Sequence, residues 1–443
     1  MKKTLVSLAA ASLIVTSAVA ADKGIDIVTT GQAVVYYETQ TNNGKDDADL
    51  FNQKGSQANV GLQLNLDADL KNNFTFGSQL SYLGTAGLEN NLVSGTKQGV
   101  TSQGNTESEL ALTKIFVAKK IANTTVKIGR QELPKTLSPL AFSEGWNVFK
   151  NTFDAVLAVN TDIPDTTVVG AYVTAANTTN GAAGGINTMN NITGNAAGTA
   201  GGAYMLTAQT KAIPMTTLTV TYYDVSDMTT DDAGNQTNGL TAVWADAAVA
   251  GKELPMGLKF GLQAGQISPE NIKTTGANEY ANTTAFGARI GLAPIDALTL
   301  CLAYTSVDGD KNKKNLAVKN LGTGVKTPLF TQMVYNQNAI ALDANTYMVK
   351  AAYNTGDYGT VIAQYGMTTA GDNNLQGKDA DYNEFDLIYK VKAAGVEYFA
   401  AYLYRTIDDK TTTGMQHANA PLQSNGKFAT EENRIRVWAR YAF

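Results

Sequence analysis

The sequence predicts that residues 21–443 form a single, all-β domain: a transmembrane antiparallel β-barrel. Three features predict it: strands that alternate apolar with polar side chains, connections that alternate between short and long, and a last strand that ends on an aromatic residue. The chain of 443 residues contains 41 glycines and 20 tyrosines. After residue 20 it has no apolar run near the ~20 residues that a membrane helix needs. A soluble all-β chain of this length would usually divide into domains, but no linker or change in composition marks a division.

The first twenty residues have the pattern of a cleaved signal peptide. Lys2 and Lys3 form a positively charged start, residues 5–15 are apolar, and residues 18–20 form a small-residue cleavage site. We therefore expect residues 1–20 to be removed on export. Without the two lysines, 32 basic side chains stand against 39 acidic ones, a net charge near −7. This balance argues against nucleic acid as a partner.

Eighteen candidate strands follow, an even number, as single-chain bacterial barrels require. They cover residues 25–37, 56–70, 74–83, 107–119, 125–130, 153–160, 167–175, 201–210, 217–225, 237–250, 257–267, 280–292, 297–305, 344–354, 359–369, 379–392, 396–407 and 431–443. The alternation is clearest in residues 56–70, where alanines, leucines and a valine face one way and Gln63, Asn65 and Asp67 face the other. The strand at 107–119 needs a bulge to keep its parity. Sixteen strands remain an alternative.

The connections between these strands alternate between short and long. Short ones such as 71–73 and 393–395 fit periplasmic turns, and long ones such as 84–105 and 306–343 fit extracellular loops. A β-sandwich gives no reason for this alternation, whereas a barrel threaded through a membrane from one side does.

The last strand has one apolar face and one basic face. Ile435, Val437, Ala439, Tyr441 and Phe443 alternate with a set that includes three arginines. A strand that ends on the final, aromatic residue resembles the assembly signal of bacterial outer-membrane barrels. We therefore predict that Tyr441 and Phe443 form this signal and that the chain resides in the bacterial outer membrane.

Charged side chains in the clearer strands keep to the parity predicted to face the lumen. A charge on the lipid-facing side near the bilayer midplane costs ~2–4 kcal/mol, so we expect the polar face to line the aqueous lumen. We predict a basic ladder on the lumen wall, formed by Lys259, Arg289, Lys350, Arg434, Arg436 and Arg440. The alternative is that these groups only keep water in the lumen and pair with Glu397, Glu384 or Asp386.

The third long connection, loop 3 (residues 131–152), carries six large apolar side chains that would lack a partner in an outer loop. They are Leu137, Leu140, Phe142, Trp146, Val148 and Phe149. We expect the loop to fold inward and narrow an aqueous channel, since barrels of 16–18 strands are wide enough to hold one. The predicted constriction consists of Arg130, Glu132, Lys135, Glu144, Lys150 and Asp154. The alternative is an outer loop that packs on its neighbours or on another subunit.

Residues 128–134 (IGRQELP), continuing to 151–154 (NTFD), and residues 160–167 (NTDIPDTT) carry a family pattern. They resemble OprD-like porins and the related major outer-membrane porins of the campylobacter group. The match covers about forty residues, and Ala155 departs from the glycine that the family often has there. The resemblance implies an eighteen-stranded, trimeric channel for ions and small solutes, with loop 3 as the constriction.

We therefore expect an outer-membrane porin for passive diffusion of ions and small hydrophilic solutes, with a weak preference for cations because the chain is acidic. Expected partners are a homotrimer, membrane lipid and lipopolysaccharide; no cofactor or metal is expected. The rival is a structural or adhesive barrel with a plugged lumen. The lysines of its seventh long loop would contact lipopolysaccharide phosphates or simply be solvated; they are Lys311, Lys313, Lys314, Lys319 and Lys326.

An enzyme is not expected. The single histidine, His417, falls in the ninth long loop rather than on a strand, where a catalytic group would lack fixed geometry. The single cysteine, Cys301, excludes an intrachain disulfide. The sequence also lacks zinc-spaced Cys/His sets, phosphate-binding Gly-Lys loops and haem-attachment motifs.

Overall fold

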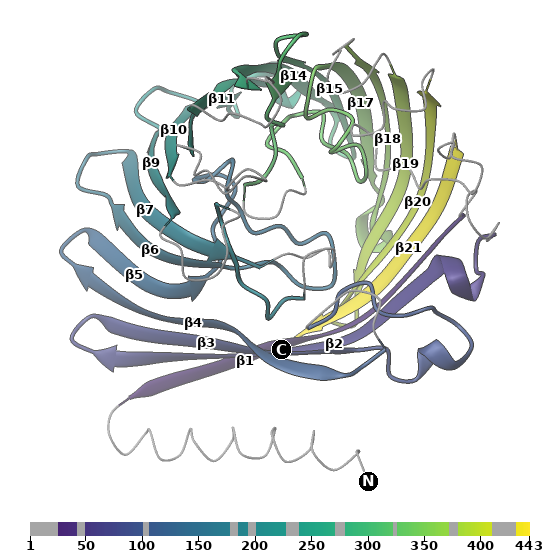
Figure 1. The fold of residues 1–443 in the computed structure, drawn as a ribbon, viewed down its shortest axis with the longest axis horizontal. Helices are drawn as coiled ribbons and strands as arrows, with labels where there is room; N and C mark the ends of the chain where they lie inside the picture. Colours follow the sequence, from purple (N-terminus) through teal and green to yellow (C-terminus); the bar gives the residue numbers. More distant parts are fainter. Residues whose placement is uncertain are drawn as a thin grey trace.

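The structure is a computed structural model that describes residues 25–41, 49–100, 106–177, 185–193, 201–226, 239–270, 280–321, 326–371, 380–409 and 431–443. Eighteen strands within them pair edge to edge in a closed antiparallel ring (Figure 1). Each strand of the ring pairs with the next one along the chain, and the first pairs with the last. This architecture confirms the predicted barrel.

The strands of the ring are β1 (Asp26–Gln40), β2 (Ser56–Lys71), β3 (Phe74–Gly84), β4 (Glu109–Ile121), β5 (Thr124–Gln131), β6 (Phe153–Asn160), β7 (Thr166–Ala176), β9 (Gly202–Thr210), β10 (Thr216–Ser226), β11 (Gly239–Ala250), β12 (Lys259–Glu270), β14 (Thr283–Ile295), β15 (Leu298–Asp308), β17 (Ala344–Asn354), β18 (Thr360–Ala370), β19 (Ala380–Ala393), β20 (Val396–Asp409) and β21 (Glu431–Ala442). All eighteen predicted strands overlap these, so the sixteen-strand alternative is wrong.

Outside the ring, β8 (Asn190–Asn191) adds to β7, and β13 (Tyr280–Ala281) pairs with β16 (Lys314–Asn315). The described 3-10 turns are η1 (Gln53–Gly55), η2 (Leu88–Asn90), η4 (Pro255–Gly257) and η5 (Gly356–Tyr358). In the part of the chain that the structure describes, no helix has the length and apolar character to cross a membrane.

The ring closes where β21 meets β1. The paired residues run from Gln32 with Ala442 to Gln40 with Arg434. Beyond β21, Phe443 N donates to Gly31 O at 3.0 Å, and Gly31 N donates to Phe443 O at 2.7 Å. The final residue therefore takes part in closing the barrel.

A bulge in β4 keeps the side chains of that strand on their proper faces, as predicted. Gln79 of β3 pairs with Lys114 and Leu80 pairs with Leu112, so Thr113 is the extra residue. Thr113 Oγ1 donates to Gln79 Oε1 at 2.9 Å, and Thr113 is 3% exposed. The bulge places Thr113 and Lys114 both on the inner side while Leu112 faces outward.

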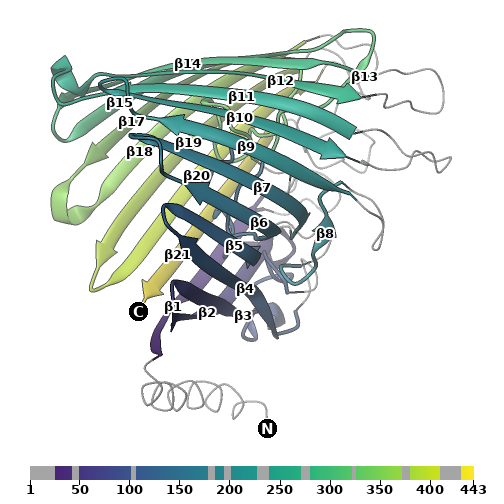
Figure 2. The ribbon, with the colours of Figure 1, turned by 90° about the vertical axis from the view of Figure 1, so that its left-hand side faces the viewer.

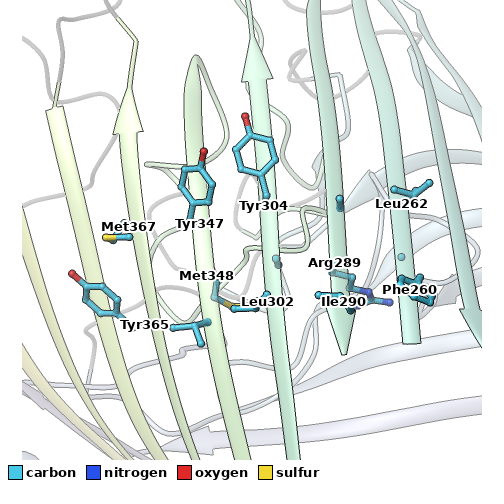
Figure 3. Close-up of a pocket in the computed structure, with 14 residues that line it drawn as sticks. Phe260, Leu262, Arg289, Ile290, Leu302, Tyr304, Tyr347, Met348, Tyr365 and Met367 are labelled. Atoms are coloured by element: carbon cyan, nitrogen blue, oxygen red, sulfur yellow. The ribbon is translucent and has the colours of Figure 1, made fainter. Parts of the chain in front are cut away.

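The two faces of the ring differ in chemistry. The outer face exposes apolar side chains such as Val35 (54% exposed) and Leu262 (54% exposed), whereas their strand neighbours Tyr36 and Gln263 of the inner face are buried. On the outer face of β12–β18 lies a groove of about 750 Å³ that is lined almost wholly by apolar and aromatic side chains. Tyr304 and Tyr347 lie side by side there (Figure 3). Their ring centres are 4.8 Å apart. An outer face of this kind suits hydrocarbon, as in a barrel that spans a membrane.

Short and long connections lie at opposite ends of the barrel (Figure 2). Two-residue turns join β2 to β3 and β19 to β20; both residues of each turn have positive φ, which matches the twist of paired strands. The strand ends that the long connections join lie at the other end, and the described residues of two of these connections continue into the ring. The chain terminus at Phe443 lies at the end with the short turns (Figure 2).

Candidate functional site

Loop 3 lies inside the ring, packed against two parts of the inner wall (Figure 1). Leu133 and Leu140 belong to an apolar cluster that includes residues of β7 to β12. Val148 and Phe149 belong to a second cluster, which includes Val34 of β1. Leu140 and Val148 have 0% of their area exposed. The apolar side chains thus attach the loop to the wall.

A second long connection, loop 7 (residues 309–343), also enters the ring, which the sequence analysis missed. Its described part bonds to loop 3: Asn320 Nδ2 donates to Phe142 O at 2.7 Å. In the other direction, Lys135 Nζ of loop 3 donates to Thr327 O at 2.9 Å. The two loops therefore form one connected body inside the barrel.

Glu132, a predicted constriction residue, lies in the lumen between two lysines. Lys150 Nζ lies 3.0 Å from Glu132 Oε2, and Lys114 of β4 forms an ion pair with Glu132 Oε1. Burial disfavours the carboxylate, but these two ammonium groups outweigh it and lower the pKa of Glu132. Lys114 was not predicted, because only the bulge at Thr113 brings it to the inner side.

Lys135 and Glu144 have different surroundings in loop 3. Lys135 is exposed inside the barrel, with its ammonium 5.1 Å from the centre of the Phe142 ring. Glu144 is 5% exposed, and its Oε2 accepts from Trp146 N at 2.9 Å. Lys135 can therefore meet a solute, whereas Glu144 supports the shape of the loop.

Arg130 and Asp154 lie on the outer face of the barrel, which corrects their prediction as constriction residues. Arg130 pairs with Asp154 on one side and with Ile115 on the other, and Ile115 faces outward with 44% of its area exposed. Arg130 Nε donates to Asp154 Oδ1 at 2.9 Å. The physical reason is strand parity: the next residue, Gln131, is fully buried on the inner side, so Arg130 must point away.

Arg434 and Arg436 face inward but are buried, at 7% and 3% exposure. Arg434 Nη1 lies 2.6 Å from Glu38 Oε1, and Arg436 Nη2 lies 2.7 Å from Glu38 Oε2. Arg434 Nη2 also pairs with Glu432 Oε1 at 2.6 Å. Tyr335 of loop 7 joins the group, since its hydroxyl donates to both Glu38 oxygens at 3.0 Å. These two arginines hold strands and loop 7 together and are shielded from solute.

Sequence reasoning missed Glu38, although its parity with Val34 and Tyr36 on β1 was a usable signal. The predicted strand ends at Tyr37, which leaves Glu38 in a loop. In the structure β1 continues to Gln40, and this places Glu38 on the inner wall beside Arg436.

The other wall cations line a recess of about 380 Å³ on the inner side of β11–β18. Lys259, Arg289 and Lys350 project into it, and among the described residues they form no ion pair. Loop 7 covers part of the recess, with the centre of the Phe330 ring 4.2 Å from Arg289 Cζ. Gln364 also lines it. The recess thus combines positive charge, an aromatic face and an amide, which suits a small polar or anionic solute.

The remaining predicted residues have structural positions of their own. Arg440 Nη2 donates to Val148 O at 3.1 Å and so binds loop 3. Tyr441 and Phe443 lie on the outer face, 48% and 51% exposed.

Lys326, expected on an outer loop, is 5% exposed inside the barrel, and its Nζ donates to Val334 O at 2.6 Å. Lys319 of the same loop is half-buried. His417 lies outside the described residues. No group of three or more His, Cys, Asp or Glu side chains in the described ranges is placed to hold a metal ion.

No protein-family model matches this chain, and no curated protein matches it in sequence. Solved structures do match it in fold. Pseudomonas aeruginosa OccK8 (OprE) superimposes with a TM-score of 0.69 at 14% identity, over 94% of this chain and 98% of that one. Acinetobacter baumannii OccAB3 gives 0.65 at 14% identity, over 94% and 99%.

Pseudomonas aeruginosa OpdK, solved with vanillate, gives a TM-score of 0.66 at 12% identity, over 94% of this chain and 98% of that one. These neighbours are OprD/Occ porins. At identities of 12–14% the likeness shows the fold. The resemblance to OprD-like porins read from the sequence is therefore confirmed for the fold: this chain forms the same kind of barrel along nearly its whole length.

Proposed function

We propose that this chain forms a water-filled channel in a bacterial outer membrane, through which ions and small hydrophilic solutes diffuse passively. The observation that carries the proposal is the opposite chemistry of the two faces of a closed eighteen-stranded ring. Apolar side chains cover the outside, while Glu132, Lys150, Lys259, Arg289 and Lys350 place charge inside. Barrels of 16–18 strands enclose an aqueous channel, and loops 3 and 7 would narrow it.

Recordings of single channels in a planar bilayer test the proposal. The purified chain, refolded in detergent, should give stepwise currents whose size rises with salt concentration. An adhesive barrel with a plugged lumen would fold equally well and give no steps. Migration of unheated and heated samples on a denaturing gel shows whether the barrel is folded, so a silent bilayer with a folded sample would contradict the channel.

Ionic preference has two candidates. The acidic excess of the chain supports the predicted weak preference for cations. The recess supports the opposite preference, because Lys259, Arg289 and Lys350 have no ion-pair partner among the described residues. Aromatic carboxylates are a chemical class that such a recess suits, and the neighbour OpdK was solved with vanillate. Reversal potentials in a salt gradient decide between the two, and Arg289→Gln should shift them toward cations if the recess determines the preference.

We also propose a homotrimer, loss of residues 1–20 on export, contact with lipid and lipopolysaccharide, and no catalytic activity. The resemblance to trimeric porins and the pattern of the first twenty residues support the first two. The native mass in detergent should equal three chains, and the mature protein should begin at Ala21.

A further inference from the structure

One side chain holds the backbone of Phe149, in the return half of loop 3. Gln98 Nε2 donates to Phe149 O at 3.0 Å, and Phe149 N donates to Gln98 Oε1 at 2.7 Å. The side-chain amide therefore binds this backbone as a neighbouring strand would. Gln98 is 1% exposed and Phe149 is 2% exposed, so water does not compete for these bonds.

Gln98 belongs to loop 2 (residues 85–108) and is itself fixed to the barrel wall by Asn59 of β2. Asn59 Nδ2 donates to Gln98 O at 2.7 Å, and Gln98 N donates to Asn59 Oδ1 at 3.0 Å. Asn59 is fully buried. Asn59, Gln98 and the Phe149 backbone thus form a chain of paired amides, here called the amide relay, that connects the wall to loop 3 through loop 2.

The ring of Phe149 lies against Gly61, two residues beyond Asn59 on the same face of β2. A Cβ at Gly61 would lie only 2.8 Å from Phe149 Cζ and 3.3 Å from Leu83 Cδ2. A residue with a side chain at this position would push the ring away from the wall. The absence of a side chain at Gly61 therefore lets loop 3 approach β2 closely.

Two arginines of β21 fix the same segment from the other side of the closure. Arg436 Nη1 donates to Trp146 O at 2.8 Å, and Arg440 Nη2 donates to Val148 O at 3.1 Å. Both arginines also contact other parts of the barrel, whereas the contacts of Gln98 described above serve loop 3 and the wall alone. Substitutions in the amide relay therefore give the most specific test of how loop 3 is positioned.

We propose that Asn59, Gln98 and Gly61 are positioning residues that set the width of the channel by holding the return half of loop 3 against β2. The inference rests on the proposed channel function and adds to it a role for loop 2. Without the relay, buried polar groups of loop 3 lose their partners, and the segment moves into the lumen, where it obstructs the current.

Single-channel conductance of Gln98→Ala and Gly61→Ala tests this role. Both variants should show a loss of conductance and larger fluctuations of the open current than wild type. Gly170→Ala is the control, because Gly170 pairs with Leu206 on the outer face, away from loop 3, and nothing lies within 4 Å of a Cβ there. Should Gln98→Ala fail to fold, Gly61→Ala alone decides the outcome.

A chemical readout reports the position of the loop independently of current. Val148 is fully buried. In a Cys301→Ser background, Val148→Cys should therefore resist a water-soluble maleimide. The same cysteine in a Gln98→Ala or Gly61→Ala chain should react. Unchanged conductance and labelling in both variants would overturn the inference, as would an equal loss in Gly170→Ala. If wild type conducts no current, the channel proposal fails, and labelling still tests the placement of the loop.

Discussion

At the scale of single residues, Lys326 shows how a charge is accommodated between the two inner loops. Its ammonium donates to Val334 O at 2.6 Å and lies 5.0 Å from the centre of the Trp146 ring. Burial lowers the pKa of Lys326 to about 8, although the nearby carboxylates of Glu144, Glu384 and Asp386 act in the other direction. In the unfolded chain the ordinary value near 10.5 applies. Between pH 8 and pH 10.5 the unfolded chain therefore binds more protons at this site than the folded chain does.

This difference predicts that the contribution of Lys326 to stability rises with pH. Below pH 8 the buried ammonium lowers the free energy of unfolding. Its deprotonation removes this penalty as pH approaches 10.5, and the free energy of unfolding rises by about 3 kcal/mol at most. The midpoint of thermal unfolding, followed by migration on gels, should rise from pH 7.5 to pH 10 in wild type relative to Lys326→Met. Methionine has similar length and no charge, so parallel curves for the two proteins would show that Lys326 does not titrate in this way.

Gly31 and Phe443 give a second prediction at this scale. A Cβ at Gly31 would lie 2.6 Å from Phe443 Cζ and 2.6 Å from Gln63 O, so Gly31→Ala should displace the terminal ring or the strand. We expect a loss of stability of about 1–3 kcal/mol, measured as a lower urea midpoint. Gly170→Ala is the control, since nothing lies within 4 Å of a Cβ there. An equal loss in both variants would mean that only the strand preference of glycine had been measured.

At the scale of elements, the strands could be predicted and the inner loops only in part. Alternation of side chains reports which face of a strand is wet, so even the bulge at Thr113 could be expected from a break in parity. The inward course of loop 3 followed from its large apolar side chains. Loop 7 also carries large apolar side chains, such as Leu329, Phe330 and Ile340, so the same signal was present there and was missed. Its contacts with Phe142 and Glu38 join residues far apart in the chain. No local pattern records such contacts.

The faces of β5 and β6 give a prediction for this scale. Asp154 lies on the outer face and Glu132 lies in the lumen, although both were expected in the constriction. Glu132→Gln removes a negative charge beside Lys114 and Lys150, so the reversal potential in a salt gradient should shift toward anions. Asp154→Asn should leave the reversal potential unchanged. A shift of equal size in both variants would place Asp154 in the path of the ions.

At the scale of the whole molecule, the barrel is specified by pattern more than by particular residues. Identities of 12–14% with OccK8, OccAB3 and OpdK accompany the same fold over 94% of this chain. Alternating strands and unequal hairpins suffice for a closed ring, because closure pairs every strand edge and leaves the apolar face outside. The lining of the lumen is under no such constraint. This explains why the fold could be predicted along the whole chain while the roles of Arg434 and Arg436 could not.

Closure of the ring can be tested by a disulfide between its first and last strands. Val35 of β1 and Ala439 of β21 are direct partners on the outer face, and hydrogen-bonded partners have Cα atoms about 5.5 Å apart, within the reach of a disulfide. In a Cys301→Ser background, Val35→Cys with Ala439→Cys should lose both free thiols on oxidation, as counted by alkylation and mass. Val35→Cys with Val437→Cys is the control, because Val437 pairs with Tyr37 and diagonal neighbours lie about 7–8 Å apart, beyond that reach. Free thiols in both oxidised pairs would mean that β1 and β21 do not meet in this register.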